Sequence, residues 1–317
     1  MVCAKHRATV ALATPLGTPL AGDTLFGHFC WALRESVGEA RLQRVLDGYT
    51  QGKPWLVVSD GFPAGFLPKP TLPRHFEPQM DTTGRKAAKR QRWISMQCAG
   101  LPLRELLAAA VDDEAAYGAS PVLAVQAHNT INRRSGTTGK DSFAPYASTQ
   151  HFHAEGQKVD IYLVIDDERV STETVGQLLV AIGAAGYGRD ASIGLGKFEL
   201  AAMVPADLPS PTGANASMTL APCAPQGLGF DGRRSYWRVL TRYGRHGNAH
   251  ALAPNPFKTP VLLAATGAVF VPETVYEPRQ FIGQGLGGNG RLSKIEPETV
   301  QQGYAPVLPV ALERSRA

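Results

Sequence analysis

The chain has 317 residues, of which 44% are hydrophobic and 19% are charged, and its formal net charge is +5. These values are typical of a globular protein with about two domains, and no apolar run is long enough to cross a membrane. The first residues lack the apolar core of a signal peptide, and the four cysteines form no CxxC pair. The sequence therefore indicates a cytoplasmic protein with neither a zinc site nor a disulfide framework, whose mild positive charge permits a polyanionic partner.

Hydrophobic patterns predict the first elements in chain order. A strand is expected over residues 7–14, and it is followed by a helix that Asp23 caps and Gly38 ends. The next elements expected are a short helix over 42–49, a strand at 56–58, a proline-rich segment at 63–70, a basic insertion at 74–92 and a helix at 102–110.

A second set of elements completes a first structural unit. Strands are expected at 122–127, 150–154 and 159–165, and a helix from about Thr172 to Gly186. The order strand, helix, strand, strand, helix, glycine-rich loop, strand is that of a ferredoxin-like, or RRM-like, unit. We assign residues 1–203 to this unit.

The last third of the chain predicts a different, β-rich unit. Residues 204–232 are rich in Pro, Gly, Ala and Ser, and they are interpreted as a linker or surface loop. The strands expected after them lie at 236–243, 260–264, 268–271 and 305–312. Residues 204–317 are therefore expected to form a second, degenerate ferredoxin-like unit, and the fold class is α+β with two such units and glycine-rich loops.

Two glycine-rich segments carry most of the functional information: a first glycine segment at 186–198 and a second glycine segment at 283–291. Clustered glycines let the backbone approach a ligand and point N–H groups at it. Arg189, Lys197 and Arg291 add positive charge, so the expected ligand is a phosphate. The candidate contact residues are Gly186, Tyr187, Gly188, Arg189, Ser192, Gly194, Gly196, Lys197, Gly283, Gln284, Gly285, Gly287, Asn289 and Arg291. The alternative is that both segments are tight turns between strands.

A nucleotide cofactor fits these segments poorly. Gly283-x-Gly285-x-x-Gly288 matches the dinucleotide fingerprint formally, but no amphipathic helix can follow it. The first glycine segment comes after a helix and has Phe198 where a P-loop needs a hydroxyl. The histidines offer no third metal ligand with suitable spacing. We therefore expect no cofactor, no metal site and no catalytic residue.

A hairpin tip segment at 129–140 is polar and basic. Asn, Arg and Thr are side chains that contact phosphates, 2′-hydroxyls and base edges. The candidates here are Asn129, Asn132, Arg133 and Arg134. The alternative is an ordinary exposed hairpin tip, because basic surface loops are common.

Several segments carry a family resemblance. They are Gly22-Asp23-Thr24-Leu25-Phe26-Gly27, Ser59-Asp60-Gly61-Phe62-Pro63, Gly65-Phe66-Leu67-Pro68-Lys69-Pro70, residues 129–136 and the two glycine segments. Together they resemble the RAMP superfamily of CRISPR proteins, and most closely the group-five-like subunit of type III-A (Csm) effector complexes. The resemblance spans nearly the whole chain, although the basic insertion at 74–92 is poorly matched.

The resemblance implies an RRM-like scaffold without catalytic residues. Such a subunit binds the repeat-derived 5′ handle of the crRNA, packs against the large palm-domain subunit and abuts the first backbone RAMP subunit. A thumb hairpin reaches across the guide–target duplex, and the hairpin tip segment is our candidate for part of it. Lys69, in the Phe-Leu-Pro-Lys-Pro run, joins the candidate RNA contacts. Bases would stack on Tyr187 or Phe198, and the isolated chain should expose apolar surface.

Two alternatives stay open at this stage. The first is a RAMP endoribonuclease that cuts precursor crRNA, with His28 as its general acid or base, although His28 is equally compatible with a buried helix position beside Trp31. The second is the equivalent capping subunit of another CRISPR subtype, type III-B or IV.

Overall fold

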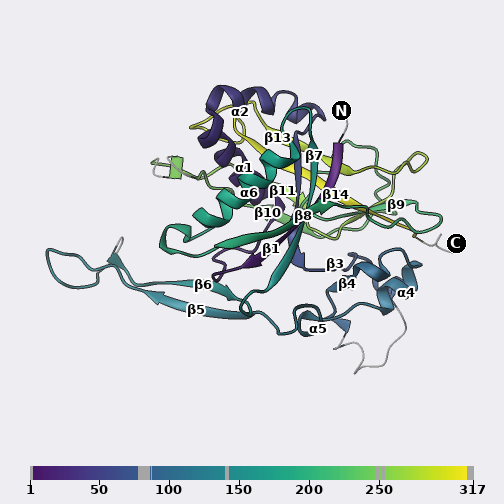
Figure 1. The fold of residues 1–317 in the computed structure, drawn as a ribbon, viewed down its shortest axis with the longest axis horizontal. Helices are drawn as coiled ribbons and strands as arrows, with labels where there is room; N and C mark the ends of the chain where they lie inside the picture. The colour runs from purple at the N-terminus through teal and green to yellow at the C-terminus, as the bar shows by residue number, and fades with distance from the viewer. Residues whose placement is uncertain are drawn as a thin grey trace.

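The computed structural model in Figure 1 describes residues 3–77, 86, 88–139, 143–247, 250–251 and 254–312. In these ranges the chain forms two four-stranded sheets and three two-stranded sheets, all antiparallel, and its α-helices lie in the first 185 residues. The protein is therefore a mixed α/β chain with several small antiparallel sheets, as the α+β class predicts. No helix of the described ranges is long and apolar enough to span a membrane.

The first sheet has the strand order β2-β7-β1-β8. Its strands are β1 (Cys3–Leu12), β2 (Leu56–Pro63), β7 (Lys158–Asp166) and β8 (Phe198–Pro205). The helix α1 (Gly22–Val37) follows β1, and α6 (Thr172–Ala185) connects β7 to β8. In Figure 1 the two helices lie together against this sheet. The predicted order of strands and helices is therefore confirmed, with further elements inserted between β2 and β7.

The central strand β7 is buried on both faces from Val159 to Asp166. The sequence predicts that every second residue of this strand, from Val159 to Ile165, is apolar and faces the core, and these residues are buried as predicted. The residues between them are buried as well, because Tyr162 packs with side chains of the second sheet. A strand covered on both faces needs apolar residues at almost every position.

The helix ends follow the sequence in part. The N-terminal Ser171 accepts a hydrogen bond from the Thr174 amide and starts α6, as the capping preference of serine predicts. Gly38 ends α1 with a φ of 83°. The prediction that Asp23 caps α1 is wrong: Ala21 is the cap residue, and Asp23 lies inside the first turn. Its carboxylate is instead bound by Arg242.

The second sheet has the order β12-β9-β14-β13. Its strands are β9 (Ala216–Thr219), β12 (Val269–Phe270), β13 (Phe281–Gly287) and β14 (Val300–Val310). β9 is fully buried and pairs with both β12 and β14. The interpretation of residues 204–232 as a linker or surface loop is therefore wrong for this strand, whose small Ala and Ser side chains fit a tightly packed sheet interior.

The two sheets share their core. Tyr304 of β14 packs in one cluster with Phe26 and Tyr49, while Phe62 and Tyr162 of the first sheet pack in another cluster with Leu308 of β14. Tyr49 stacks on Phe26 at a ring-centroid distance of 4.7 Å and meets Tyr304 edge-on at 5.3 Å. The first 203 residues and the rest are thus held together by apolar burial.

A long hairpin leaves this body, as Figure 1 shows. It is made of β5 (Val122–His128) and β6 (Tyr146–Phe152), which pair from Val122 opposite Phe152 to His128 opposite Tyr146. We call it the arm. It contains the strands predicted at 122–127 and 150–154, and the hairpin tip segment lies between them.

The remaining elements are short. They are α2 (Glu39–Leu46), α4 (Leu103–Ala108), α5 (Asp113–Tyr117), the hairpins β3 (Phe66–Pro68) with β4 (Trp93–Ser95) and β10 (Val239–Arg242) with β11 (Val261–Ala264), and the 3-10 turns η1 (Tyr49–Gln51), η2 (Arg74–Phe76), η3 (Met96–Cys98) and η5 (Ala191–Ile193). Of the predicted insertion at 74–92, residues 78–85 and 87 lie outside the described residues.

Candidate nucleic-acid interface

The first glycine segment starts where α6 ends, at Gly186, whose φ is 99°. The Tyr187 amide donates to the Gly196 carbonyl over 2.9 Å and closes the segment into a loop. A Cβ atom on Gly186 would lie 2.7 Å from the Leu195 carbonyl oxygen, and its backbone has a positive φ. Glycine is therefore required here by close backbone packing, in addition to any role in ligand binding.

Most amides of this loop already have acceptors inside the protein. The Gly188 amide donates to Nε2 of His28 over 3.1 Å, and the Arg189 amide donates to the Thr18 hydroxyl over 3.1 Å. The amides of Gly196 and Lys197 donate to Pro15 and Thr14, each within 2.9 Å. The expectation of bare N–H groups is therefore wrong for these four residues. At these four positions a phosphate has to be bound by the exposed side chains of the loop.

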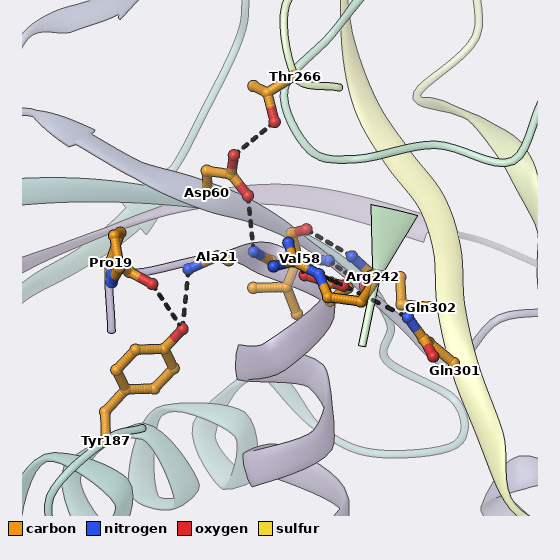
Figure 2. Close-up of polar contacts among 11 residues, drawn as sticks. Pro19, Ala21, Val58, Asp60, Tyr187, Arg242, Thr266, Gln301 and Gln302 are labelled. Atoms are coloured by element: carbon orange, nitrogen blue, oxygen red, sulfur yellow. Dashed lines mark hydrogen bonds and ion pairs between the residues drawn. The ribbon is translucent and has the colours of Figure 1, made fainter. Parts of the chain in front are cut away.

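The two aromatic residues of the loop are part of the core. Tyr187 is fully buried and Phe198 is 3% exposed. Figure 2 shows the Tyr187 hydroxyl between two backbone groups: it donates to the Pro19 carbonyl over 2.8 Å and accepts from the Ala21 amide over 2.9 Å. The expectation that bases stack on Tyr187 or Phe198 is therefore wrong, because neither ring face is open to solvent.

The exposed residues of the loop include Arg189, Ser192 and Lys197. The Arg189 side chain is half exposed; it donates to the Thr149 carbonyl of β6 and pairs with Asp190 at 3.3 Å. Burial, together with the Arg189 charge, lowers the pKa of His151 on the same strand. The first glycine segment and the base of the arm thus form one surface, which the sequence did not indicate.

His28 lies on α1 beneath this loop. Its ring is 5.0 Å from the Tyr187 ring, and Nε2 accepts the Gly188 amide proton. Burial lowers the pKa of His28 to about 4. The imidazole is therefore neutral at neutral pH and its Nε2 lone pair is occupied, so this residue holds the loop in place and is poorly suited to act as a general base.

The second glycine segment is mostly a strand. Gly283, Gly285 and Gly287 belong to β13 and pair with Tyr304, Gln302 and Val300 of β14. A Cβ atom on Gly285 would lie 2.6 Å from the Tyr49 carbonyl oxygen and 2.7 Å from its ring. The expectation of a glycine-rich loop is therefore wrong for the part in β13, where glycine permits close packing on η1. The alternative of a tight turn does not describe these residues either, because they form a strand.

The end of this segment is an exposed turn. The amides of Gly288 and Gly290 donate to Thr299 and Pro297, each over 2.9 Å. The Asn289 side chain accepts the Arg291 amide proton over 3.2 Å, and both residues are exposed. Gln284 is committed elsewhere, because its side-chain amide donates to the Gln226 carbonyl. Arg291 is thus the cation that this turn presents to solvent.

The hairpin tip segment is exposed at the end of the arm. Asn129, Arg133 and Arg134 are exposed, whereas the Asn132 side chain accepts the Arg134 amide proton over 2.9 Å and shapes the turn. On one face of the arm Gln150 donates to Gln126 over 2.6 Å and His128 lies 2.8 Å from the Ser148 hydroxyl, and the exposed Val122 and Tyr146 lie on the same face. The opposite face carries Leu123 and Val125, which are 63% and 72% exposed.

Lys69 lies apart from these segments, on the chain after β3. Its ammonium group is 2.8 Å from the Glu77 carboxylate, and its side chain is only 13% exposed. Its charge is therefore largely neutralised inside the protein.

A buried polar network joins the two halves of the chain near the start of α1 (Figure 2). The Asp60 carboxylate of β2 accepts the Gly22 amide proton over 2.7 Å and a bond from the Thr266 hydroxyl. Burial raises the pKa of Asp60 to about 6. The Asp23 carboxylate is 2% exposed and is bound by both Nε and Nη2 of Arg242, at 2.6 and 3.0 Å.

One exposed surface was missed by the sequence reasoning. On the β10–β11 hairpin and the residues that extend it, Tyr243 is 74% exposed and Phe257 is 64% exposed. Residues 239–246 alternate between exposed and more buried positions in the structure, but the sequence itself does not alternate between polar and apolar side chains, so it carried no signal for this surface. Among the described residues, no group of three His, Cys, Asp or Glu side chains is placed to hold a metal ion.

Solved structures share this fold over almost the whole chain. A chain of a Csm1–Csm4 cassette in complex with AMPPNP matches with a TM-score of 0.60 at 17% identity, over 98% of this chain and 100% of that chain. A chain of the cassette in complex with pppApA gives 0.59 at 16% identity, with the same coverage. A chain of a Csm3–Csm4 subcomplex of the type III-A CRISPR-Cas interference complex gives 0.58 at 12% identity, over 95% of this chain and 99% of that chain. No protein-family model and no curated protein sequence matches.

Csm4 is the component named in both kinds of complex. The chain therefore shares its fold with chains of these Csm complexes, one of which belongs to a type III-A CRISPR-Cas interference complex. The resemblance inferred from the sequence is confirmed as a likeness of fold.

Proposed function

We propose that this protein is a non-catalytic, RNA-binding subunit of a type III CRISPR effector complex, which caps the 5′ handle of the crRNA. The observation that carries the proposal is the full-length match to chains from both Csm1–Csm4 and Csm3–Csm4 structures. The matched structures contain Csm4 together with Csm1 in one case and with Csm3 in the other. We therefore propose a Csm1-like palm-domain subunit and a Csm3-like backbone subunit as partners, bridged by this chain in antiviral defence.

The proposal includes a finer description of the fold. The order β2-β7-β1-β8, with α1 and α6 as the crossover helices, supports a ferredoxin-like unit over residues 1–203. The sheet β12-β9-β14-β13 lacks α-helices between its strands in the described residues, which is consistent with a degenerate second unit over residues 204–317. In this description the arm is the thumb, inserted before the third strand of the first unit.

The RNA contacts are proposed for exposed side chains. Arg189 and Lys197 are exposed beside the base of the arm, Arg133 and Arg134 lie at its tip, and Arg291 is exposed in the turn after β13. Guanidinium and ammonium groups neutralise phosphates irrespective of sequence, which suits a handle held along its backbone. The target RNA would be contacted only indirectly, through the guide–target duplex that the arm crosses.

Co-expression with the genomic neighbours tests the proposal. The tagged chain should copurify with a large palm-domain protein, a backbone RAMP protein and RNA whose 5′ ends all carry the same repeat-derived handle. Sequencing of the RNA and identification of the proteins give the readout, and the neighbouring genes also distinguish type III-A from III-B or IV. A chain that purifies without RNA and without either protein would refute the proposal.

The endoribonuclease alternative receives no support from the site. Its suspected residue, His28, is only partly exposed, and its Nε2 accepts a hydrogen bond from the Gly188 amide. Incubation of the purified protein with labelled repeat RNA tests this directly. If the protein cleaves the RNA without metal and His28→Ala abolishes the cleavage, the protein is an endoribonuclease and the scaffold proposal is refuted.

A further inference from the structure

The β10–β11 hairpin and its extension have an outer face with unusual chemistry for a protein surface. From Val239 to Arg245 every second side chain is exposed, and Tyr243 is the most exposed of the aromatic residues there, at 74%. Leu262, opposite Thr241, is 60% exposed on the same face. Phe257 is opposite Arg245 and is 64% exposed, with the Arg245 guanidinium 5.8 Å from its ring centroid.

The inner face of the same hairpin is fixed to the body. Arg242 forms the two-pronged contact with the buried Asp23 of α1. His246 is buried, with its ring nitrogen 2.8 Å from the Ser293 hydroxyl, and the Thr259 amide donates to the Leu292 carbonyl over 2.8 Å. The outer residues are therefore held by the body, and no residue of the described ranges covers them.

The charge of this region is one-sided. Between Asp231 and Glu273 the sequence has no acidic residue, but it has five arginines and one lysine: Arg233, Arg234, Arg238, Arg242, Arg245 and Lys258. Arg242 is paired with Asp23, whereas Arg233, Arg234, Arg238 and Arg245 are exposed. A surface of exposed aromatic rings among arginines complements a polyanion that has flat bases.

The position of the hairpin connects the two predicted RNA-contact segments. On one side it contacts α1, where the Trp31 ring lies 5.5 Å from the His250 ring. Trp31 comes one helical turn after His28, the residue that holds the first glycine segment. On the other side Thr259 and His246 contact Leu292 and Ser293, directly after Arg291. The hairpin thus lies between the first glycine segment and the Arg291 turn.

We propose that Tyr243, Arg245 and Phe257 form a stacking platform for single-stranded RNA, with bases on the two rings and a phosphate on the guanidinium. The proposal rests on the RNA-binding function proposed above, and it supplies the base contacts that the buried Tyr187 and Phe198 cannot make. RNA fits better than a protein partner because the segment between Asp231 and Glu273 has cationic and no acidic side chains, so a protein partner would need an acidic counterpart. A protein partner is one of the outcomes that the test distinguishes.

The test uses substitutions that distinguish base stacking on an aromatic ring from general apolar contact. Tyr243→Leu and Phe257→Leu keep an apolar side chain but remove the π-face, while Tyr243→Phe keeps the face and is the matched control. Affinity of the full-length protein for a fluorescein-labelled 30-nucleotide polyuridine RNA is measured by anisotropy. Each leucine variant should bind at least about fivefold more weakly, the double variant more weakly still, and Tyr243→Phe within about twofold of the unchanged protein.

The outcomes separate this inference from the proposed function. If the unchanged protein binds RNA and Lys197→Ala weakens binding, but both leucine variants bind normally, the platform is overturned and the RNA-binding function stands. If the unchanged protein does not bind RNA, both are overturned. If the leucine variants bind RNA normally and Leu262→Glu prevents copurification of a partner subunit, the face is a protein interface.

A second measurement uses the copurified complex with its own RNA. Ultraviolet cross-linking followed by mass spectrometry should find nucleotide adducts on Tyr243 or Phe257. Adducts on other segments, without any at these two residues, would overturn the platform even if the isolated chain binds polyuridine.

Discussion

Nε2 of His28 accepts a hydrogen bond from the Gly188 amide inside the protein. This bond shows that the first glycine segment is held in place by the body of the protein. The loop is not a flexible string of free amides. Four of its amides, those of Gly188, Arg189, Gly196 and Lys197, donate to His28, Thr18, Pro15 and Thr14. The exposed charged side chains of the segment are therefore the groups to test at this scale.

Stability should depend on pH through His28. The folded protein resists protonation of this imidazole down to about pH 4, whereas the unfolded chain takes up the proton near pH 6.5. The neutral ring therefore contributes its full stabilisation above about pH 6.5, and that contribution is lost as the pH falls toward 4. His28→Gln offers an acceptor but does not titrate, so its free energy of unfolding should fall less over this range, as measured by denaturant unfolding at a series of pH values.

Asp60 titrates with the opposite sign, because burial raises its pKa to about 6. It is present in both proteins, so its effect cancels in the comparison of His28→Gln with the unchanged chain. Identical pH profiles for the two proteins would contradict the role given to His28.

Lys197 tests the electrostatic part of RNA binding. Its side chain is exposed on the first glycine segment. Lys197→Ala should weaken binding of polyuridine and polyadenine RNA to a similar extent, and it should reduce the slope of log affinity against log salt by about one. Fluorescence anisotropy between low and moderate salt gives the slope.

Arg104→Ala is the matched control for Lys197→Ala. It removes an exposed cation from α4, which lies away from the arm in Figure 1. Equal losses in both variants would mean that the protein attracts RNA only through its overall charge.

At the scale of the elements, the glycines of β13 have a packing role that the number of glycines in the sequence does not show. Gly285 is needed because its backbone packs on Tyr49. Gly285→Ala should lower the free energy of unfolding by about 1–3 kcal/mol, because the new methyl group would displace the η1 backbone or the Tyr49 ring. Denaturant unfolding measures the change, and RNA affinity under native conditions should stay the same.

Gly27 is the contrasting position. It lies within α1, and a Cβ atom there would meet nothing within 4 Å. Gly27→Ala should raise the free energy of unfolding by about 0.5–1 kcal/mol, because alanine favours the helix. If both glycine variants were destabilised equally, the packing explanation for Gly285 would fail.

At the scale of the whole molecule, the arm is an extended hairpin with an exposed face that carries Leu123 and Val125. A two-stranded hairpin has too little burial to hold an apolar face to itself, so Leu123 and Val125 are exposed in the isolated chain. This agrees with the expectation that a subunit built to sit between partners exposes apolar surface when it is alone.

Self-association should follow from this face. The double change Leu123→Ser and Val125→Ser should reduce aggregation of the isolated chain in light scattering, with a change in the free energy of unfolding within about 0.5 kcal/mol. It should also reduce copurification of the effector complex. Val275→Ser, at a single residue that is 87% exposed, is the control and should change neither result. Unaltered aggregation together with normal assembly would show that this face has no partner.

The division of the chain at residue 203 is still a proposal at this scale. Tyr304 packs with Tyr49, Phe62 and Tyr162 pack with Leu308, and Asp23 pairs with Arg242. These contacts join the two sheets, so the two proposed units are expected to unfold together.

Local patterning was enough to predict much of the fold. The apolar spacing of α1 and α6, the glycine at 38 and the strand near 159–165 follow from side-chain periodicity and backbone preference, which act over a few residues. The family resemblance likewise rests on short segments, and it agrees with the fold of the solved structures. The β9 strand was not predicted, because small Ala and Ser side chains are typical of loops and only the neighbouring strands show that this segment belongs to a sheet.

The site depended on contacts between residues far apart in the sequence. From the sequence alone, a glycine beside an arginine indicates an anion site, but it cannot show whether the neighbouring amides already have acceptors. Tertiary packing decided that Tyr187 and Phe198 are in the core, that Lys69 is paired with Glu77, and that Tyr243 and Phe257 are exposed. The physical reason is that burial and hydrogen bonding depend on which distant segments meet, whereas propensity and periodicity are properties of the local chain.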